Sequence, residues 1–379
     1  MPVSADAAET DRAILLAAVL LLACLGVLAV QSSSITTRSE GFEPIYLTRH
    51  LTNLTLGLVF GWAASRVRPA TVSRFAWPVL AATITTLSLV AIPQVGVSAG
   101  GATRWLRLPG FQMQPSEWAK LALPLVAARV LSGRARLRDQ AGLFAAAATV
   151  FVLVLRQPDL GTTLLLAGGF GVSLVLGGWP LRWLVGLAAI GAGGVTVLAL
   201  RGYQLRRIEG WLATWRDWRE APYQLKQSLI CFGEGGWAGV GLGRGWQKLS
   251  FLPEGHTDFV VAVVAEEMGV LGVAFLAGCW LTVLLCGVRL LAAFPPQSFR
   301  TIAAGTLLIQ LVGQAGLNVA VVTGVIPPTG IPHPLLSYGG NSLLVTAGSI
   351  GLFAGLSSRP AIAHEALGAH ETRDTEPNQ

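Results

Sequence analysis

The sequence predicts an all-α membrane protein, a helix bundle with about ten transmembrane helices and a large extracytoplasmic loop between helices 7 and 8. The chain has 379 residues, of which 53% are hydrophobic and 12% are charged, about half the charged fraction of a soluble domain. Its apolar residues gather in long runs, and a helix that crosses a bilayer needs roughly 20 of them. The formal net charge of +7 therefore bears on membrane orientation, and nucleic-acid binding is not indicated.

Ten apolar runs are candidates for these helices. They lie at residues 13–30, 47–65, 75–92, 116–131, 141–155, 160–177, 183–200, 258–288, 301–322 and 338–357. The fourth and fifth are short for a full crossing, and the eighth is longer than a crossing needs. We predict one membrane domain over 13–357, between a cytoplasmic N-terminal tail (1–12) and a polar cytoplasmic C-terminal tail (358–379).

Basic residues between the runs predict the orientation of the bundle. One set of loops and run ends carries Arg66, Arg68, Arg74, Arg134, Arg136, Arg138, Arg182, Arg289, Arg300 and Arg359. Lys and Arg are enriched in cytoplasmic loops, so these loops and both termini are predicted to face the cytoplasm of a cytoplasmic-membrane protein. The other face then holds 31–46, 93–115, 156–159, 201–257 and 323–337.

The cysteines and the first apolar run exclude two other classes of protein. None of the four cysteines has CxxC spacing, so neither a disulfide framework nor a zinc site is indicated. The first run follows Asp6, Glu9 and Asp11, whereas a signal peptide begins with basic residues, so we expect a retained helix.

Ionisable residues crowd the junction before the eighth run. Glu254, His256 and Asp258 lie within five positions of one another, and Glu266 and Glu267 follow two turns deeper. A carboxylate at the mouth of a membrane helix is partly desolvated, which suits a general base. Charged groups at membrane depth face a cavity or a partner. The alternative is that Asp258 is only the N-cap of a helix.

The predicted loop 201–257 is both basic and rich in tryptophan. Its charged and aromatic residues include Arg201, Arg206, Arg207, Arg216, Arg219, Lys226, Arg244, Lys248, Trp211, Trp215, Trp218, Trp237 and Trp246. This composition suits an anionic ligand held at the level of the lipid headgroups. An amphipathic helix resting on the membrane explains residues 205–220 equally well. The many glycines between 233 and 245 favour a shaped loop.

Three more polar clusters fall on the same predicted face. Glu117 and Lys120 are three residues apart at the start of the fourth run, so they either line a polar cavity or form a structural ion pair. Asp159 lies in a turn between two runs, where a helix N-cap is the leading alternative to a site role. The segment 318–342 holds four prolines and four glycines and cannot be one continuous helix. Such backbone is tolerated near membrane depth where it walls a cavity.

Several motifs, in this order, resemble the SEDS family (shape, elongation, division and sporulation), which contains RodA, FtsW and SpoVE. They are Gly101-Ala-Thr-Arg-Trp-Leu, Gln114-Pro-Ser-Glu, Gln157-Pro-Asp-Leu-Gly-Thr, Tyr223-Gln-Leu-Lys-Gln-Ser, Leu252-Pro-Glu-Gly-His-Thr-Asp-Phe, Ala265-Glu-Glu-Met-Gly and Ser337-Tyr-Gly-Gly. The resemblance covers roughly 13–357. Tyr223-Gln-Leu and Gly241-Leu-Gly-Arg-Gly-Trp-Gln-Lys-Leu249 are more similar to the FtsW and SpoVE branch.

The resemblance implies a peptidoglycan glycosyltransferase, active in cell division or cell-shape maintenance, that polymerises lipid II outside the cytoplasmic membrane. It implies a class B penicillin-binding protein, a transpeptidase, as partner, and Asp258 as the catalytic aspartate. The matched motifs add Trp105, Gln227, His256 and Ser337 to the expected substrate-binding residues. Departures from the family pattern are Gly255, His333, in place of a usual leucine, and Asn341.

Inverting sugar transfer from a lipid diphosphate needs a base opposite the leaving group and cations on the leaving group. We expect Asp258 to take the proton of the acceptor hydroxyl. Arg104, Lys120, Lys226 and Lys248 are candidates for holding the diphosphate, with Glu117 positioning Lys120 or a cation. No cofactor is certain; a divalent cation, Mg²⁺ or Mn²⁺, is left open, and no metal ligand is assigned.

Other functions are weighed against this one. A lipid II flippase would also need a membrane cavity and an anion site, but it should offer a charged path between the two faces, whereas the polar motifs gather on one. A scaffold for a transpeptidase would not require Asp258. An ion-coupled transporter should show paired broken helices, and no convincing internal repeat is visible.

Overall fold

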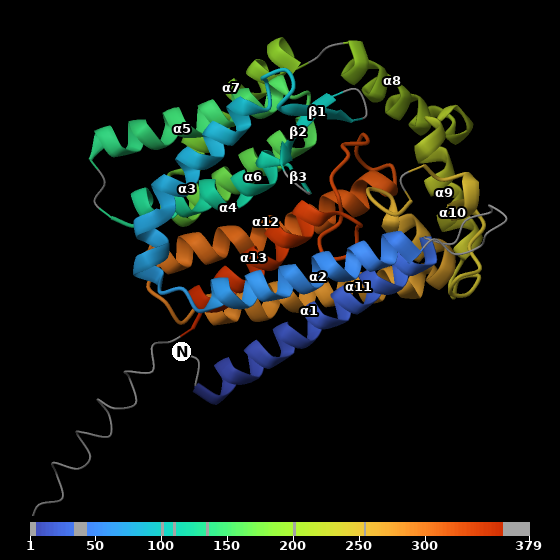
Figure 1. Ribbon diagram of the computed structural model, residues 1–379, viewed down its shortest axis with the longest axis horizontal. Coiled ribbons are helices and arrows are strands. Elements are labelled where there is room, and N and C mark those ends of the chain that lie inside the picture. Colours follow the sequence, from blue (N-terminus) through green and yellow to red (C-terminus); the bar gives the residue numbers. More distant parts are fainter. Residues whose placement is uncertain are drawn as a thin grey trace, which may run out of the picture.

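Long helices occupy the ten apolar runs (Figure 1). The computed structural model describes residues 5–33, 44–99, 102–108, 111–133, 136–199, 202–253 and 255–358. The long helices are α1 (Ala5–Ser33), α2 (Pro44–Ser65), α3 (Pro69–Leu89), α4 (Pro115–Leu131), α5 (Leu137–Arg156), α6 (Leu160–Leu176), α7 (Leu181–Ala199), α11 (Val260–Leu291), α12 (Phe299–Val322) and α13 (Gly340–Leu356). The predicted all-α bundle is confirmed.

Among the described residues, 5 helices are both long and apolar enough to cross a membrane: α1, α3, α5, α11 and α12. Helices α6 and α13 are apolar but shorter. Helix α4 contacts α3, α5, α6, α12 and α13 and is buried along most of its length, so it lies at the centre of the bundle.

Helix α1 begins at Ala5, so the segment predicted as a tail is helical over residues 5–12. Asp11 forms an ion pair with Arg289 at 3.3 Å, at the end of α11. Arg12 donates to the carbonyl oxygen of Ser357, just after α13, at 3.2 Å. These contacts hold the ends of three helices together. Residues 1–4 and 359–379, in the two predicted tails, lie outside the described residues.

A small antiparallel sheet and several short helices gather at the other end of the bundle (Figure 1). The strands, in spatial order, are β1 (Gly96–Ala99), β2 (Ala102–Leu108) and β3 (Phe111–Met113). The segment 201–257 forms α8 (Gly202–Arg216), a 3-10 turn (Trp218–Glu220), α9 (Tyr223–Gly235) and α10 (Gln247–Ser250). The sheet was not predicted, because its strands are short and lie in a polar segment without a strong alternating pattern.

A kink at Gly269 divides α11 and explains the length of the eighth run. Its φ of 65° and ψ of −164° interrupt the helix, a backbone conformation that only glycine adopts without strain. A Cβ atom at Gly269 would lie 2.5 Å from the backbone nitrogen of Gly239 and from the carbonyl oxygen of Trp237. The kink therefore separates a short helical segment, which carries Glu266 and Glu267, from the longer segment 270–291.

Replacing Gly269 by Ala should destabilise the protein, because it adds both backbone strain of roughly 1–3 kcal/mol and a clash with the backbone. Thermal unfolding of the purified protein in detergent measures the change. The matched control is Gly278→Ala, further along α11, where a Cβ atom would meet nothing within 4 Å. That variant should be neutral or slightly stabilising. Equal unfolding temperatures for the two variants would contradict this account of the kink.

Candidate active site at the mouth of α11

Asp258 lies half-buried immediately before α11, and its main chain is held by a buried amide. The side-chain nitrogen of Asn318, in α12, donates to the carbonyl oxygens of Asp258 and Ile331, both at 2.8 Å. The N-cap residue of α11 is Phe259, whose side chain makes no capping hydrogen bond, and Asp258 lies one residue before it.

The loop between α12 and α13 faces the Asp258 side chain. Gly330 has a φ of 75°, and a Cβ atom there would lie 3.4 Å from Oδ2 of Asp258. A larger side chain at this position would crowd the carboxylate. Glycine at position 330 thus permits both the positive φ of this turn and the close approach of the loop to Asp258.

Residues 256–258 are bound to the same loop at several points. The backbone nitrogen of Tyr338 donates to the carbonyl oxygen of His256 at 2.8 Å. The hydroxyl of Ser337 donates to the carbonyl oxygen of Thr257 at 2.6 Å. The His256 ring packs between Tyr46 and Tyr338, at centroid distances of 5.2 and 5.8 Å. The fold thus brings the predicted residues His256 and Ser337 next to Asp258.

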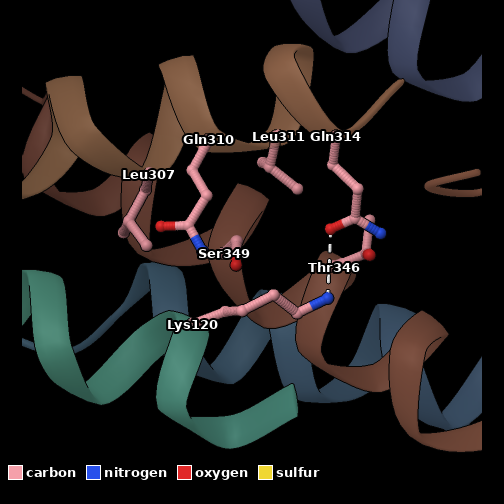
Figure 2. Close-up of a pocket in the computed structure, with 7 residues that line it drawn as sticks. All are labelled: Lys120, Leu307, Gln310, Leu311, Gln314, Thr346 and Ser349. Atoms are coloured by element: carbon pink, nitrogen blue, oxygen red, sulfur yellow. Dashed lines mark hydrogen bonds between the residues drawn. The ribbon is translucent and has the colours of Figure 1, made fainter. Parts of the chain in front are cut away.

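Glu117 and Lys120 form a buried ion pair that is connected to this loop. Lys120 Nζ lies 2.6 Å from Glu117 Oε2, with side-chain exposures of 6% and 4%. It also donates to Gln314 Oε1 at 3.0 Å (Figure 2). Gln314 Nε2 in turn donates to the carbonyl oxygen of Pro332 at 2.8 Å. The structure thus agrees in part with both interpretations: Glu117 and Lys120 form an ion pair, and Lys120 also lines a small cavity.

The cavity beside Lys120 is small, about 10 Å³, and lies between α4, α12 and α13 (Figure 2). Its wall combines apolar and polar side chains: Lys120, Leu307, Gln310, Leu311, Gln314, Thr346 and Ser349. This space accommodates about one water molecule and no sugar. The cavity in this structure is therefore too small to be the substrate pocket.

Arg104 and Asp159 hold a second turn against the same loop. Arg104 donates through Nε to the carbonyl oxygen of Gln157 at 3.1 Å and through Nη2 to that of Pro158 at 2.6 Å. Asp159 Oδ1 accepts from the backbone nitrogen of Thr162 at 3.1 Å, so Asp159 is the N-cap of α6. A Cβ atom at Gly161 would lie 2.7 Å from the carbonyl oxygen of Thr329. Trp105 lies half-buried beside Arg104 in β2.

Two of the substrate-binding residues predicted in the large loop, Lys226 and Lys248, contact other residues of the protein. Lys226 Nζ donates to the carbonyl oxygen of Arg219 at 3.3 Å and lies over the Trp218 ring. Gln227 is half-buried in α9. Lys248 Nζ lies 2.5 Å from Glu267 Oε1, with side-chain exposures of 1% and 3%, and also contacts Ser32. The structure thus places Lys248 in a buried ion pair.

Glu266 and Glu267 organise the glycine-rich loop. Glu266 Oε1 accepts from the backbone nitrogens of Trp246 and Gln247 at 2.6 and 3.1 Å. Glu267 Oε2 accepts from the backbone nitrogen of Gly243 at 3.0 Å. Both carboxylates thereby meet the expectation that a charge at this depth has a partner. Glu254 lies outside the described residues.

Sequence reasoning missed the buried amides of α12 as site residues. Gln310, Gln314 and Asn318 recur every four residues in an otherwise apolar helix and share one face. Polar side chains on one face of a membrane helix point to the interior of a bundle, and this spacing was the available signal. Tyr46 was also missed, because nothing local distinguishes a tyrosine near a helix start.

His333, a departure from the family pattern, is buried in the wall of the site beside Trp280. Its Nδ1 lies 3.0 Å from the carbonyl oxygen of Pro334. Burial lowers its pKa from the ordinary 6.5 to about 4, so His333 is neutral at pH 7 and packs as an apolar ring. The unfolded chain binds a proton at this residue more readily than the folded protein does.

Stability should therefore fall as the pH drops through the window from about 6.5 to about 4, and His333 should have no such effect above it. The full contribution is roughly 3 kcal/mol. Replacing His333 by Leu should make the stability of the folded protein depend less on pH within this window. Unfolding temperatures of the wild type and the His333→Leu variant, measured across this pH window, give the contribution of His333. Both proteins contain the same carboxylates, so the effect of carboxylate titration cancels in the comparison. Parallel profiles would contradict the prediction.

Comparison with known proteins agrees with this geometry. A family model described as "Cell cycle protein", FTSW_RODA_SPOVE, matches residues 12–360. A protein of Geobacter sp. (strain M18) named "Probable peptidoglycan glycosyltransferase FtsW" is 36% identical over 360 residues, which cover 92% of this chain and 97% of that protein. A protein of the same name from Legionella pneumophila subsp. pneumophila is 35% identical over 345 residues, which cover 87% and 86%.

Solved structures are similar as well. A chain from a structure described as "Structural coordination of polymerization and crosslinking by a peptidoglycan synthase complex" has a TM-score of 0.72 and 31% identity, covering 90% of this chain and 96% of that one. The rod shape determining protein RodA of Thermus thermophilus has a TM-score of 0.67 and 29% identity, covering 90% and 95%. The predicted FtsW-like relationship is confirmed by the curated relatives. This multi-pass membrane chain belongs to the FtsW/RodA/SpoVE family, the SEDS proteins.

Proposed function

We propose that the chain is a peptidoglycan glycosyltransferase that polymerises lipid II into glycan strands, with Asp258 as the general base. The observation that carries the proposal is the placement of the Asp258 carboxylate. It lies half-buried at the mouth of α11, its main chain is held by Asn318, and it faces a glycine of the α12–α13 loop. The family membership and the names of the curated relatives support this reaction.

In the proposed reaction, the acceptor hydroxyl gives its proton to the Asp258 carboxylate as its oxygen bonds to the anomeric carbon of the donor. The bond from that carbon to the lipid diphosphate breaks with inversion, and the diphosphate leaves with the bonding electrons. Asp258 then returns its proton to water. The diphosphate needs cationic groups, but it needs little help from a general acid.

Arg104 and Lys120 are the better placed of the four cationic candidates, since each bonds to a group whose neighbourhood reaches the loop over residues 329–332. Arg104 bonds to the turn before α6, whose Gly161 approaches Thr329, and Lys120 bonds to Gln314, which bonds to Pro332. Lys226 has a partner within the large loop, and Lys248 is paired with Glu267 of α11 and with Ser32 of α1. A divalent cation, Mg²⁺ or Mn²⁺, remains part of the proposal. Among the described residues, no group of three or more His, Cys, Asp and Glu could hold a metal ion, so such a cation would take ligands from the diphosphate itself.

The proposal includes the membrane arrangement and the partner. Both termini lie in the cytoplasm, and the Asp258 end of the bundle faces outward, as the basic loops of the opposite end indicate. A class B penicillin-binding protein cross-links the strands that this chain makes. The similarity to a chain of a peptidoglycan synthase complex supports this pairing.

Replacing Asp258 by Asn should lower polymerisation by about 10²–10⁴-fold, because the acceptor hydroxyl loses its base. The assay is gel analysis of glycan polymer made from labelled lipid II by the purified chain with its penicillin-binding protein. The control is Glu209→Gln, which removes an exposed acid from α8 at the same end of the bundle. Undiminished polymerisation by a folded Asp258→Asn protein would remove Asp258 from this role. Polymer from neither wild type nor variant would favour the flippase or scaffold.

Substitutions at the Glu117–Lys120 ion pair distinguish a purely structural role from a role of the Lys120 charge in polymerisation. Lys120→Met alone should destabilise the protein by about 3–5 kcal/mol, because it leaves the Glu117 carboxylate buried without its partner. The double variant Glu117→Met/Lys120→Met should recover most of that stability but polymerise poorly, since the proposal needs the Lys120 charge. Thermal unfolding and the lipid II assay give the two readouts. Full activity in the stable double variant would make the pair purely structural.

A further inference from the structure

A second cavity lies at the opposite end of the bundle from Asp258. It has a volume of about 460 Å³ and lies between α3, α4 and α5, lined by Trp77, Arg129, Val130, Gly133, Arg138, Asp139 and Gly142. Arg129 is in the last turn of α4, and Asp139 is in the first turn of α5. The other ends of these two helices lead to β3 and to the Gln157 turn, at the Asp258 end (Figure 1). We call this space the α3–α5 cavity.

Two glycines keep the α3–α5 cavity open. A Cβ atom at Gly133 would meet nothing within 4 Å, and one at Gly142 would meet only the Trp77 ring, at 3.9 Å. The indole of Trp77 forms part of the wall. The space is therefore a hollow that the local sequence leaves unfilled, with a polar rim and an aromatic side.

The rim carries two guanidinium groups with unused donors. Arg129 Nη1 donates to the carbonyl oxygen of Ser73, and within the described residues the rest of its guanidinium has no partner. Arg138 is exposed and makes no hydrogen bond or ion pair with any described residue. Asp139 forms no ion pair with either arginine. Two cations and one anion leave a positive rim, and guanidinium forks match the geometry of phosphate.

The surroundings of the rim are apolar and suit a lipid. Leu137, next to Arg138, is 85% exposed, and the half-buried Trp77 ring of α3 adds an aromatic surface to the wall. A large apolar side chain as exposed as Leu137 on a membrane protein faces acyl chains. The cavity opens among the basic loops, which are predicted to lie at the cytoplasmic leaflet, where basic pockets between helices bind lipid headgroups. A soluble anion would not account for the apolar flank.

We propose that the α3–α5 cavity binds the headgroup phosphate of a membrane phospholipid, with Arg129 and Arg138 on the phosphate oxygens and the acyl chains along Trp77 and Leu137. Asp139 lowers the affinity for headgroups that carry only negative charge. The bound lipid ties the ends of α3, α4 and α5 together at the face opposite Asp258. This site is independent of the proposed glycosyl transfer.

The test is native mass spectrometry of the full chain in detergent, titrated with dioleoyl-phosphatidylglycerol. The double variant Arg129→Gln/Arg138→Gln should weaken binding of the first lipid by about tenfold or more. The variant Gly142→Leu should weaken it similarly, because it fills the hollow without changing charge. Asp139→Asn should strengthen it. The control Arg182→Gln removes an exposed arginine from α7 that does not line the cavity, and its affinity should stay within about twofold of wild type.

Three outcomes would overturn the proposal. An equal loss in Arg182→Gln would mean that the basic face attracts lipid without a defined site. An unchanged affinity in both the arginine and the Gly142 variants, each with a wild-type unfolding temperature, would place the lipid elsewhere. Displacement of the lipid by inorganic phosphate at about 10 mM would mean that the cavity takes a soluble anion, because acyl chains should make a phospholipid much the stronger ligand.

Discussion

The Asp258 end of this protein depends on buried amide side chains of α12 that bond to backbone carbonyls of the α12–α13 loop. Asn318 joins Asp258 to Ile331, and Gln314 joins Lys120 to Pro332. The loop contains four prolines between 327 and 334, and proline has no backbone N–H to donate. Without the amide donors of α12 its carbonyls would be buried unpaired, at a cost of roughly 1–3 kcal/mol each. The same bonds set the position of Asp258.

Polar groups at membrane depth in this bundle are therefore connected to one another. The chain of contacts runs from Glu117 through Lys120 and Gln314 to the loop, and from the loop through Asn318 to Asp258. A bundle interior offers few water molecules, so each polar side chain depends on a protein partner. This connection links α4, at the centre of the bundle, to the segment that carries Asp258. The small cavity beside Lys120 lies next to these contacts.

The large loop is held by carboxylates that lie inside the helix end it covers. Glu266 and Glu267 accept backbone donors from residues 243–247, and Glu267 also pairs with Lys248 and Ser32. At least one charged residue of this loop, Lys248, therefore stabilises the conformation of the loop itself. At the opposite end, the arginines of the α3–α5 cavity form no ion pair with any described residue, and for that reason we propose that they bind a ligand.

Local sequence determined the number and positions of the helices, because an apolar run of membrane length has no other stable conformation in a bilayer. It also identified the family through ordered motifs, and it placed Asp258, His256 and Ser337 on segments that the fold does bring together. The i,i+3 spacing indicated the Glu117–Lys120 pair, but the tertiary structure alone decided which groups far apart in the chain are paired. Lys248 meets Ser32 across 216 residues of sequence, and Asn318 meets Asp258 across 60. Hydrogen bonds and ion pairs depend on distance in space, and no spacing along the chain encodes such partners.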